Sequence, residues 1–354
     1  MNTLPLRVAL RPTFSLRPPF GLLPGLLLCG GLAWLAARLG SASWLSALGL
    51  GTLTLAILAG MVVGNALPAR LRPVTLSGID FARQRLLRLG IILYGLRLSV
   101  QQVAAVGTFG LLIDFLVLGS TFFLACWLGR RVFGLDRETT LLIGAGSSIC
   151  GAAAVMATAP VARADSNRVA VAVTTVVVYG TLAIFVYPWI CRLLPAGLGA
   201  QAFGIYTGST VHEVAQVVAI GHALGAEVEN AAVIAKMMRV MMLAPFLLLL
   251  SAWLARRAPA TEARAPLAVP WFALLFIVVA GVNSLHLLPA HWMPTLLALD
   301  NLLLAMAMAA LGLATRFHTL RRAGLRPLLL GGVLFLWLVL GGAAINLLVT
   351  ALLR

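Results

Sequence analysis

Eleven long apolar segments follow one another along the chain with only short connections between them. A helix of roughly 20 apolar residues is needed to cross the hydrocarbon core of a bilayer. The segments cover residues 19–37, 44–67, 89–106, 109–129, 138–162, 169–190, 204–222, 230–254, 268–288, 295–315 and 327–352. Because lipid offers the backbone no hydrogen-bond partners, such segments must satisfy their own peptide groups as helices. The sequence therefore predicts an all-α polytopic membrane protein.

Composition and charge agree with this class and exclude others. Hydrophobic residues make up 61% of the chain and charged residues only 10%, against about 25% charged residues in soluble domains. The net charge of +16 would suggest a nucleic-acid partner in a soluble protein. Here the arginines lie at the ends of apolar segments, as positive-inside topology requires, and they favour a cytoplasmic N-terminus. We therefore expect the lipid bilayer as partner and no nucleic acid.

Two apolar segments are interrupted by residues that break helices. Residues 144–151 read GAGSSICG and residues 204–213 read GIYTGSTVHE. Irregular backbone at membrane depth survives only inside protein or beside a wet cavity. A glycine and serine face for helix packing is the alternative explanation. We predict that 138–162 and 204–222 are broken or re-entrant, which leaves about nine full spans.

The two interruptions also resemble each other. Gly146–Val155 aligns without gaps on Gly208–Val217, with four of ten positions identical. A second, weaker match joins Tyr94–Gly107 to Leu311–Gly324. Inverted repeats with broken helices are typical of secondary transporters. The sequence thus predicts an inverted-repeat transporter fold.

This repeat suggests how the chain is organised. We expect one transmembrane transporter domain over residues 1–354, without a separate extramembrane domain. It would contain leading helices at 19–67, a first half at 86–190 with its broken segment at 138–162, and a second half at 204–352 with its broken segment at 204–222.

Ionisable residues inside apolar segments are costly and usually functional. Six stand out, namely Arg97, Asp114, His212, Glu213, Lys236 and Arg239. Arg97 and Asp114 lie near segment ends, so for both of them snorkelling to the interface is an equally good interpretation. Lys236 and Arg239 are one helical turn apart and could form a purely structural pair with Glu213, or serve a ligand.

The functional interpretation is a site for a small anion. Broken helices present free backbone N–H groups and partial positive charge, and arginine suits planar oxyanions. Glu213 and His212 would couple transport to H⁺, with Na⁺ at Glu213 as the other option. We expect alanine at position 236 or 239 to abolish anion binding while the protein still folds. The predicted substrate-binding residues are Ser147, Ser148, Ser209, Thr210, His212, Gln216, Lys236 and Arg239.

An enzymatic interpretation fails on one residue. His212 and Glu213 begin a zinc-protease-like HExxH pattern, but Gln216 stands where the second histidine is needed. The four cysteines are isolated and show no metal-binding spacing. We therefore expect no enzymatic activity, no metal site and no cofactor.

Four stretches carry a resemblance to a known family. They are LLRLGIILYGLRLSV (86–100), GAGSSICGAAAV (144–155), GSTVHEVAQVVAIGHALG (208–225) and AVIAKMMRV (232–240). The chain resembles the YeiH-type bacterial inner-membrane proteins, often labelled sulfate exporters, from about residue 44 to its C-terminus. The resemblance implies a multi-pass protein of the inner membrane, similar to the cation-proton antiporter and anion transporter group, with broken helices crossing near the midplane.

The sequence and the resemblance together lead to one principal function. We expect a proton- or sodium-coupled secondary transporter of a small anion, of the sulfate or sulfonate class, that works by alternating access. A cation or amino-acid transporter on the same scaffold, or a membrane sensor without transport, are the alternatives. A homodimer is compatible with either.

Overall fold

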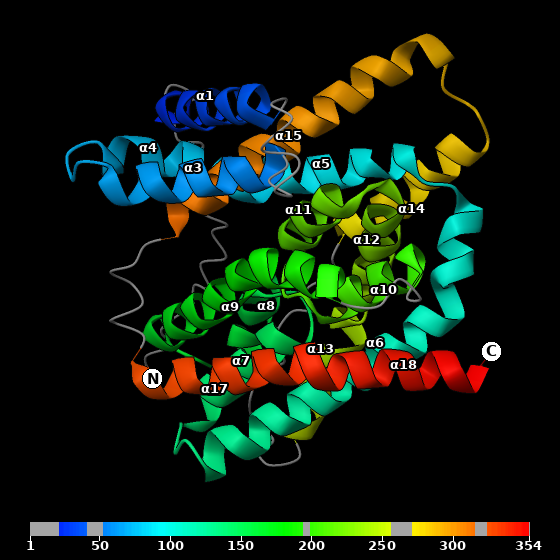
Figure 1. Ribbon diagram of the computed structural model, residues 1–354. Helices are drawn as coiled ribbons and strands as arrows, with labels where there is room; N and C mark the ends of the chain where they lie inside the picture. The colour runs from blue at the N-terminus through cyan, green and yellow to red at the C-terminus, as the bar shows by residue number, and fades with distance from the viewer. Residues whose placement is uncertain (1–20, 41–51, 194–198, 256–270, 316–323, 354) are drawn as a thin grey trace, which may run out of the picture.

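The computed structural model describes residues 21–40, 52–193, 199–255, 271–315 and 324–353. Regular structure in these ranges is entirely helical, as predicted (Figure 1). The helices are α1 (Leu23–Gly40), α3 (Thr52–Ala66), α4 (Arg72–Phe81), α5 (Leu87–Tyr94), α6 (Val100–Arg131), α7 (Arg137–Ser148), α8 (Ala152–Ala162), α9 (Ser166–Leu193), α10 (Ala200–Thr210), α11 (Val214–Leu224), α12 (Ala226–Met241), α13 (Leu243–Ala255), α14 (Trp271–Ser284), α15 (Met293–Ala314), α17 (Leu325–Leu336) and α18 (Gly342–Leu353). A π-helical turn, Ala82–Leu86, joins α4 to α5, and another, Trp337–Gly341, joins α17 to α18.

Six helical stretches in the described ranges are long and apolar enough to cross a membrane. They are Leu23–Gly40, Phe109–Arg131, Ser166–Leu193, Ala226–Leu254, Ala290–Ala314 and Leu325–Leu352. The predicted nine full spans are not confirmed. Two of the expected spans correspond to shorter helices among the described residues, α3 with 15 residues and α14 with 14. Residues 44–51 and 268–270 of these spans lie outside the described residues.

The boundary near residue 100 also differs from the sequence prediction. Two segments were expected at 89–106 and 109–129, but α6 runs unbroken for 32 residues from Val100 to Arg131. The helix begins at Ser99, whose hydroxyl accepts from the Gln102 amide at 3.2 Å while the Gln102 side chain accepts from the Ser99 amide at 2.9 Å. This reciprocal capping box fixes a helix start. Hydropathy alone placed the break eight residues too late, because apolar Leu98 and Val100 flank the capping residue Ser99.

The helices form two groups (Figure 1). The first group contains α1, α3, α4, α5 and α15, which pack on one another. The second contains α6–α13, α17 and α18, and α14 contacts both groups. The tightest contact of the first group joins α3 and α15, where a Cβ on Gly60, Gly64 or Gly312 would overlap the facing backbone. Small residues allow such close helix approach in membranes.

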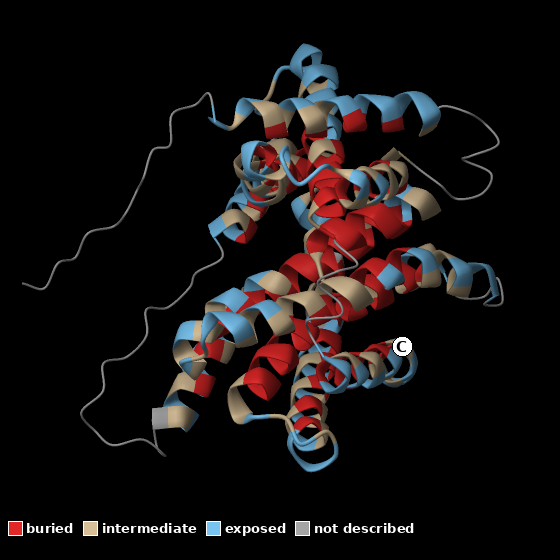
Figure 2. Cartoon of the chain, turned by 90° about the vertical axis from the view of Figure 1, so that its left-hand side faces the viewer, coloured by how far each residue is buried: buried red, intermediate tan, exposed pale blue. Residues whose placement is uncertain are grey.

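Burial shows where the core lies. Buried residues concentrate where the two groups meet and along α11 and α12 (Figure 2). The Tyr94 hydroxyl of the first group donates to Asn230 Oδ1 of the second at 2.9 Å. Positions 228–240 of α12 are all buried except Asn230, so this helix is the central element of the second group.

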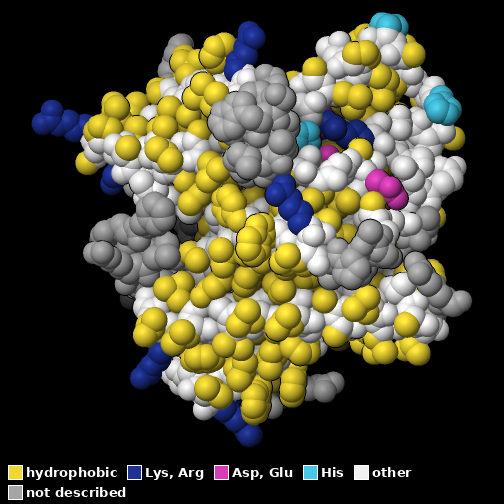
Figure 3. All heavy atoms as spheres, in the orientation of Figure 1, with side chains coloured by type: hydrophobic (Ala, Val, Ile, Leu, Met, Phe, Trp, Pro, Cys, Tyr) yellow, Lys and Arg dark blue, Asp and Glu magenta, His cyan; other side chains and the backbone are white. Residues whose placement is uncertain are grey.

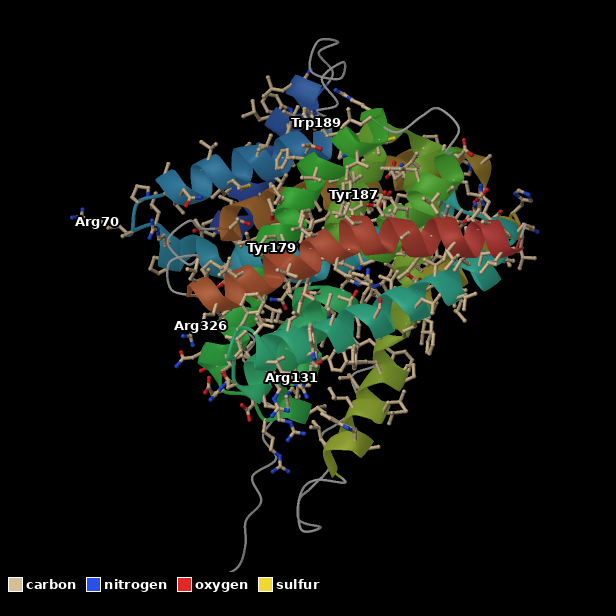
Figure 4. All side chains as sticks on the ribbon, turned by 60° about the horizontal axis from the view of Figure 1, so that its bottom comes forward. Arg70, Arg131, Tyr179, Tyr187, Trp189 and Arg326 are labelled. Atoms are coloured by element: carbon tan, nitrogen blue, oxygen red, sulfur yellow. The ribbon has the colours of Figure 1, made fainter. Side chains whose placement is uncertain are left out.

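The outer surface has the character expected of a protein in lipid. Large apolar side chains such as Phe115, Phe123 and Leu249 are exposed, and apolar side chains cover most of the face shown in Figure 3. Most Lys and Arg side chains on that face lie at its margins. Arg131 and Arg326 are likewise peripheral, at helix ends (Figure 4). An apolar surface of this extent is typical of a membrane protein.

The start of α7 is fixed by Asp136 and offers a first prediction. Asp136 Oδ1 accepts from the Thr139 amide at 2.9 Å, and Arg168 Nε donates to the same oxygen at 3.0 Å. Burial raises the pKa of the Asp136 carboxyl, but the hydrogen bonds from Thr139 and Arg168 outweigh it and hold that pKa below its usual range.

We expect Asp136→Ala to destabilise the protein by about 1 kcal/mol at neutral pH, the usual loss for an N-cap. A carboxyl whose pKa is lower in the folded state stabilises the folded protein at pH values above its unfolded-state pKa of about 3.9. That stabilisation is lost as the pH falls through the folded-state pKa. The apparent unfolding temperature should therefore differ from wild type at pH 7 and converge in acid. Glu227→Gln, an exposed carboxyl of α12 outside this network, serves as control, and an equal loss there would contradict the cap assignment.

Candidate functional site

Both predicted interruptions break the helix in the structure. The first helix pair, α7 and α8, is separated by residues 149–151, where Gly151 has φ +64°. The second pair, α10 and α11, is separated by residues 211–213, where Val211 and Glu213 are extended. Each break leaves carbonyl groups at the end of one half-helix and N–H groups at the start of the next without helical partners.

The carbonyl ends of α7 and α10 meet at two cations from α12. Lys236 Nζ donates to the Ile149 carbonyl at 2.6 Å and to the Val211 carbonyl at 2.7 Å. Each contact reaches a different break. Both Lys236 and Arg239 have no solvent exposure.

Arg239 completes the same arrangement with its planar group of donors. Nε and Nη2 donate to the Ser148 and Ser147 carbonyls at 2.7 and 3.0 Å, and Nη1 donates to the Ser209 carbonyl at 2.6 Å. Positive charge is favourable at helix C-termini, where the dipole is negative. The two cations therefore neutralise the ends of both half-helices and tie them to α12.

The aligned repeat positions make equivalent contacts. Ser147 and Ser209 both give their carbonyl to Arg239, and Ile149 and Val211 both give theirs to Lys236. The weak sequence match thus corresponds to matching local geometry at the two breaks.

An ion pair with Glu213 was the structural alternative for these cations. The salt bridges among the described residues do not include Lys236 or Arg239. Their hydrogen bonds go to main-chain carbonyls, so their direct contact with a ligand stays a prediction.

Glu213 lies on the opposite side of the breaks, at the N-termini of α8 and α11, where the helix dipole is positive. Its Oε1 accepts from the Ala152 amide, the first residue of α8, at 3.2 Å. Its carboxylate also accepts from the Gln216 amide in α11, while the Glu213 amide donates to Gln216 Oε1 at 2.9 Å. One carboxylate thus bridges two helix N-termini. A Cβ at Gly151 would overlap the Glu213 side chain, so glycine is needed there for space as well as for its positive φ.

The hydroxyl groups of the predicted site fall into two classes. Ser148, Ser209 and Thr210 are bonded within the protein: their hydroxyls donate to carbonyls one turn earlier. Thr210 also accepts from the Tyr187 hydroxyl at 2.8 Å, and Tyr187 lies between helices in Figure 4. Three predicted residues keep a buried polar atom without a partner, namely Ser147 Oγ, His212 Nδ1 and Gln216 Nε2.

Two residues left open by the sequence are now placed. Arg97 does not snorkel, since its Nη2 lies 2.7 Å from Asp300 Oδ2 on α15. Asp114 is not at an interface either, because it has no solvent exposure. Asp114 lies at helical spacing from Val106, Gly110 and Val117 on the buried face of α6. This spacing is the sequence signal that could have predicted its burial.

The comparisons with known proteins agree on a family. The family described as "Conserved hypothetical protein 698" matches residues 24–331. A UPF0324 membrane protein of Yersinia pestis is 59% identical over 92% of both chains. A UPF0324 membrane protein of Pseudomonas aeruginosa is 55% identical over 97% of this chain and 98% of its own.

The YeiH resemblance is confirmed as well. The UPF0324 inner membrane protein YeiH of Escherichia coli is 56% identical over 89% of this chain and 93% of its own. No solved structure matches the chain. The relatives' names state a membrane location and do not mention sulfate. This chain belongs to the UPF0324 family of membrane proteins, which includes the YeiH inner-membrane proteins.

Proposed function

We propose that this protein is a secondary active transporter of a small anion in the bacterial inner membrane, with sulfate or a related oxyanion or sulfonate as substrate. The observation that carries the proposal is the position of the Glu213 carboxylate, which bridges the N-termini of α8 and α11. Helix N-termini attract anions through their free N–H groups and partial positive charge. A place built to hold one carboxylate can hold another oxyanion.

The surroundings of Glu213 suit such a substrate. Its side chain is partly exposed while His212 and Gln216 beside it are buried. The buried polar atoms of Ser147, His212 and Gln216 that lack partners are available to hydrogen-bond a ligand. Lys236 and Arg239 add positive charge next to the site, because their hydrogen bonds go to neutral main-chain carbonyls and not to a carboxylate.

Coupling to a proton follows from competition for the same N–H groups. An ionised Glu213 accepts from the amides of Ala152 and Gln216 and repels an incoming anion. Protonation removes that repulsion and weakens both hydrogen bonds, since bonds to charged groups are about twice as strong as neutral ones. The proton and the anion would therefore enter together. An inverted relation of the two broken helices, which the sequence repeat predicts, would let either side of the membrane reach the site.

The test is transport of radiolabelled sulfate by protein in proteoliposomes under an imposed pH gradient. We expect Glu213→Gln to bind sulfate but to lose gradient-driven uptake, because its amide cannot take the proton. Asp165→Asn, the same carboxyl-to-amide change at an exposed residue before α9, is the control and should transport like wild type. Full gradient-driven uptake by Glu213→Gln would refute proton coupling at this residue. A dependence on Na⁺ alone would assign the carboxylate to sodium.

A further inference from the structure

A second carboxylate in the core has no role in the site described so far. Asp114 of α6 has no solvent exposure, and neither of its oxygens has a hydrogen-bond partner. Burying an ionised carboxylate without donors is costly, and such groups are normally paired or neutralised. A buried, unbonded carboxylate therefore requires an explanation.

The charges that face Asp114 come from one helix. Lys236 and Arg239 of α12 both interact with it electrostatically. The other helices packed on α6 carry charge only at the far end of α6, in the ranges described. Arg137 and Glu138 begin α7 near Gly129, and Arg326 of α17 lies 3.8 Å from the Cβ position of Gly134.

The four charges at and beside the two breaks balance when all are ionised. Lys236 and Arg239 contribute +2, and Asp114 and Glu213 contribute −2, so the sum is zero. If one carboxyl takes up a proton, the cluster carries +1 and attracts an anion. Asp114 can therefore set the charge of the core without touching the substrate.

A cavity opens between α6 and α12. This cavity of about 230 Å³ is lined by Gln102 and Val106 of α6 and by Glu227, Asn230 and Ile234 of α12. Its residues pass from exposed Gln102 and Glu227 to buried Val106 and Ile234, which are each 2% exposed. The cavity thus runs inward along both helices.

Asp114 lies further along α6 than the residues that line this cavity. Asp114 lies eight residues beyond Val106 on the same face of α6, about 12 Å further along the helix. The Met238 side chain fills the space between, with its Cε 3.5 Å from the Cβ position of Gly110. Methionine is flexible and adapts readily to its surroundings, so a side-chain movement would connect the cavity to Asp114.

We propose that Asp114 is a second proton-binding site, reached through the cavity between α6 and α12, whose protonation gives the core the positive charge that recruits the anion. The coupling part of this inference rests on the proposed transport function. The proton site itself does not.

Infrared difference spectroscopy tests the proton site directly. Spectra of protein in lipid nanodiscs, recorded between alkaline and acidic pH, show the carbonyl stretch of each carboxyl that becomes protonated. Labelling the five aspartates with ¹³C on the side-chain carboxyl separates their signals from Glu213. Among the labelled components that appear on acidification, we expect one to be missing in Asp114→Asn and to persist in Thr121→Val, a buried control on the same face of α6.

Two results would overturn the proposal. One is a difference spectrum of Asp114→Asn identical to that of wild type. The other is a component assigned to Asp114 that does not change with pH. Should Asp114→Asn fail to fold, a single buried aspartate component that titrates in the labelled wild type and loses intensity in Asp114→Glu still decides the question.

Sulfate binding, measured as the rise in unfolding temperature that sulfate causes, tests the coupling. Wild type should bind sulfate more tightly in acid, and Asp114→Asn should bind it at alkaline pH more tightly than wild type does, by roughly 5-fold or more. An unchanged alkaline affinity would refute the coupling. Absence of sulfate binding in every variant would refute the sulfate proposal while the infrared result stands.

Discussion

Replacing Arg239 by alanine is expected to unfold or severely destabilise the protein. The substitution leaves the buried carbonyls of Ser147, Ser148 and Ser209 without their donor. Each buried acceptor left unsatisfied costs about 1–3 kcal/mol, so the total reaches several kcal/mol. The measurement is the apparent unfolding temperature, with the yield of monodisperse protein as second readout.

Arg239→Lys separates charge from geometry. A lysine keeps the positive charge but lacks the planar fork that reaches both breaks. We expect an intermediate loss of stability. If Arg239→Ala unfolds within a few degrees of wild type, the carbonyl network does not hold the breaks together. This prediction replaces the expectation from sequence that alanine at this position would leave folding intact and affect only anion binding.

Replacing Gly151 by valine should disrupt the site from the opposite end of the break. The residue has φ +64° and ψ −133°, a conformation that costs a residue with a side chain about 1–3 kcal/mol. The new side chain would also overlap Glu213 and push its carboxylate away from the start of α8. We expect lower thermal stability together with loss of pH-driven sulfate uptake.

A matched control for this variant lies on α6. Gly119 is exposed and has nothing within 4 Å of its Cβ position, so Gly119→Val tests a valine for glycine exchange without a clash. It should leave transport unchanged. Normal uptake by a folded Gly151→Val protein would contradict the role given to the Glu213 bridge.

The sequence predicted the two helix breaks and the charged helix, where composition and spacing decide the structure. The Gly-Ser-Ser and Gly-Ser-Thr stretches pointed to both breaks, because glycine and serine are weaker helix formers than the apolar residues around them. The Gly-Ser-Thr stretch at 119–121 shows that such residues can also lie inside a helix. The cost of burying Lys236 and Arg239 identified the charged helix. The alignment of Ser147 with Ser209 also identified positions that make equivalent contacts.

Contacts between distant segments could not be predicted in the same way. From the sequence, Lys236 could bind Glu213, a ligand or main-chain carbonyls. It binds the carbonyls of Ile149 and Val211 because α12 packs against both breaks. Asp114 sits near a segment end by hydropathy, but α6 continues past that end and buries it.

The carbonyl network has a consequence for how the protein is made. The residues of the first break that bind Lys236 and Arg239 precede them by 87 to 92 positions. At synthesis rates of 5–20 residues per second, the ribosome needs roughly 5–20 s to cover that distance. During this time the end of α7 has left the ribosome and its permanent donors do not yet exist. A nascent chain ending at residue 230 contains both breaks but neither Lys236 nor Arg239. The contacts that join the two breaks must therefore wait for α12 to enter the membrane.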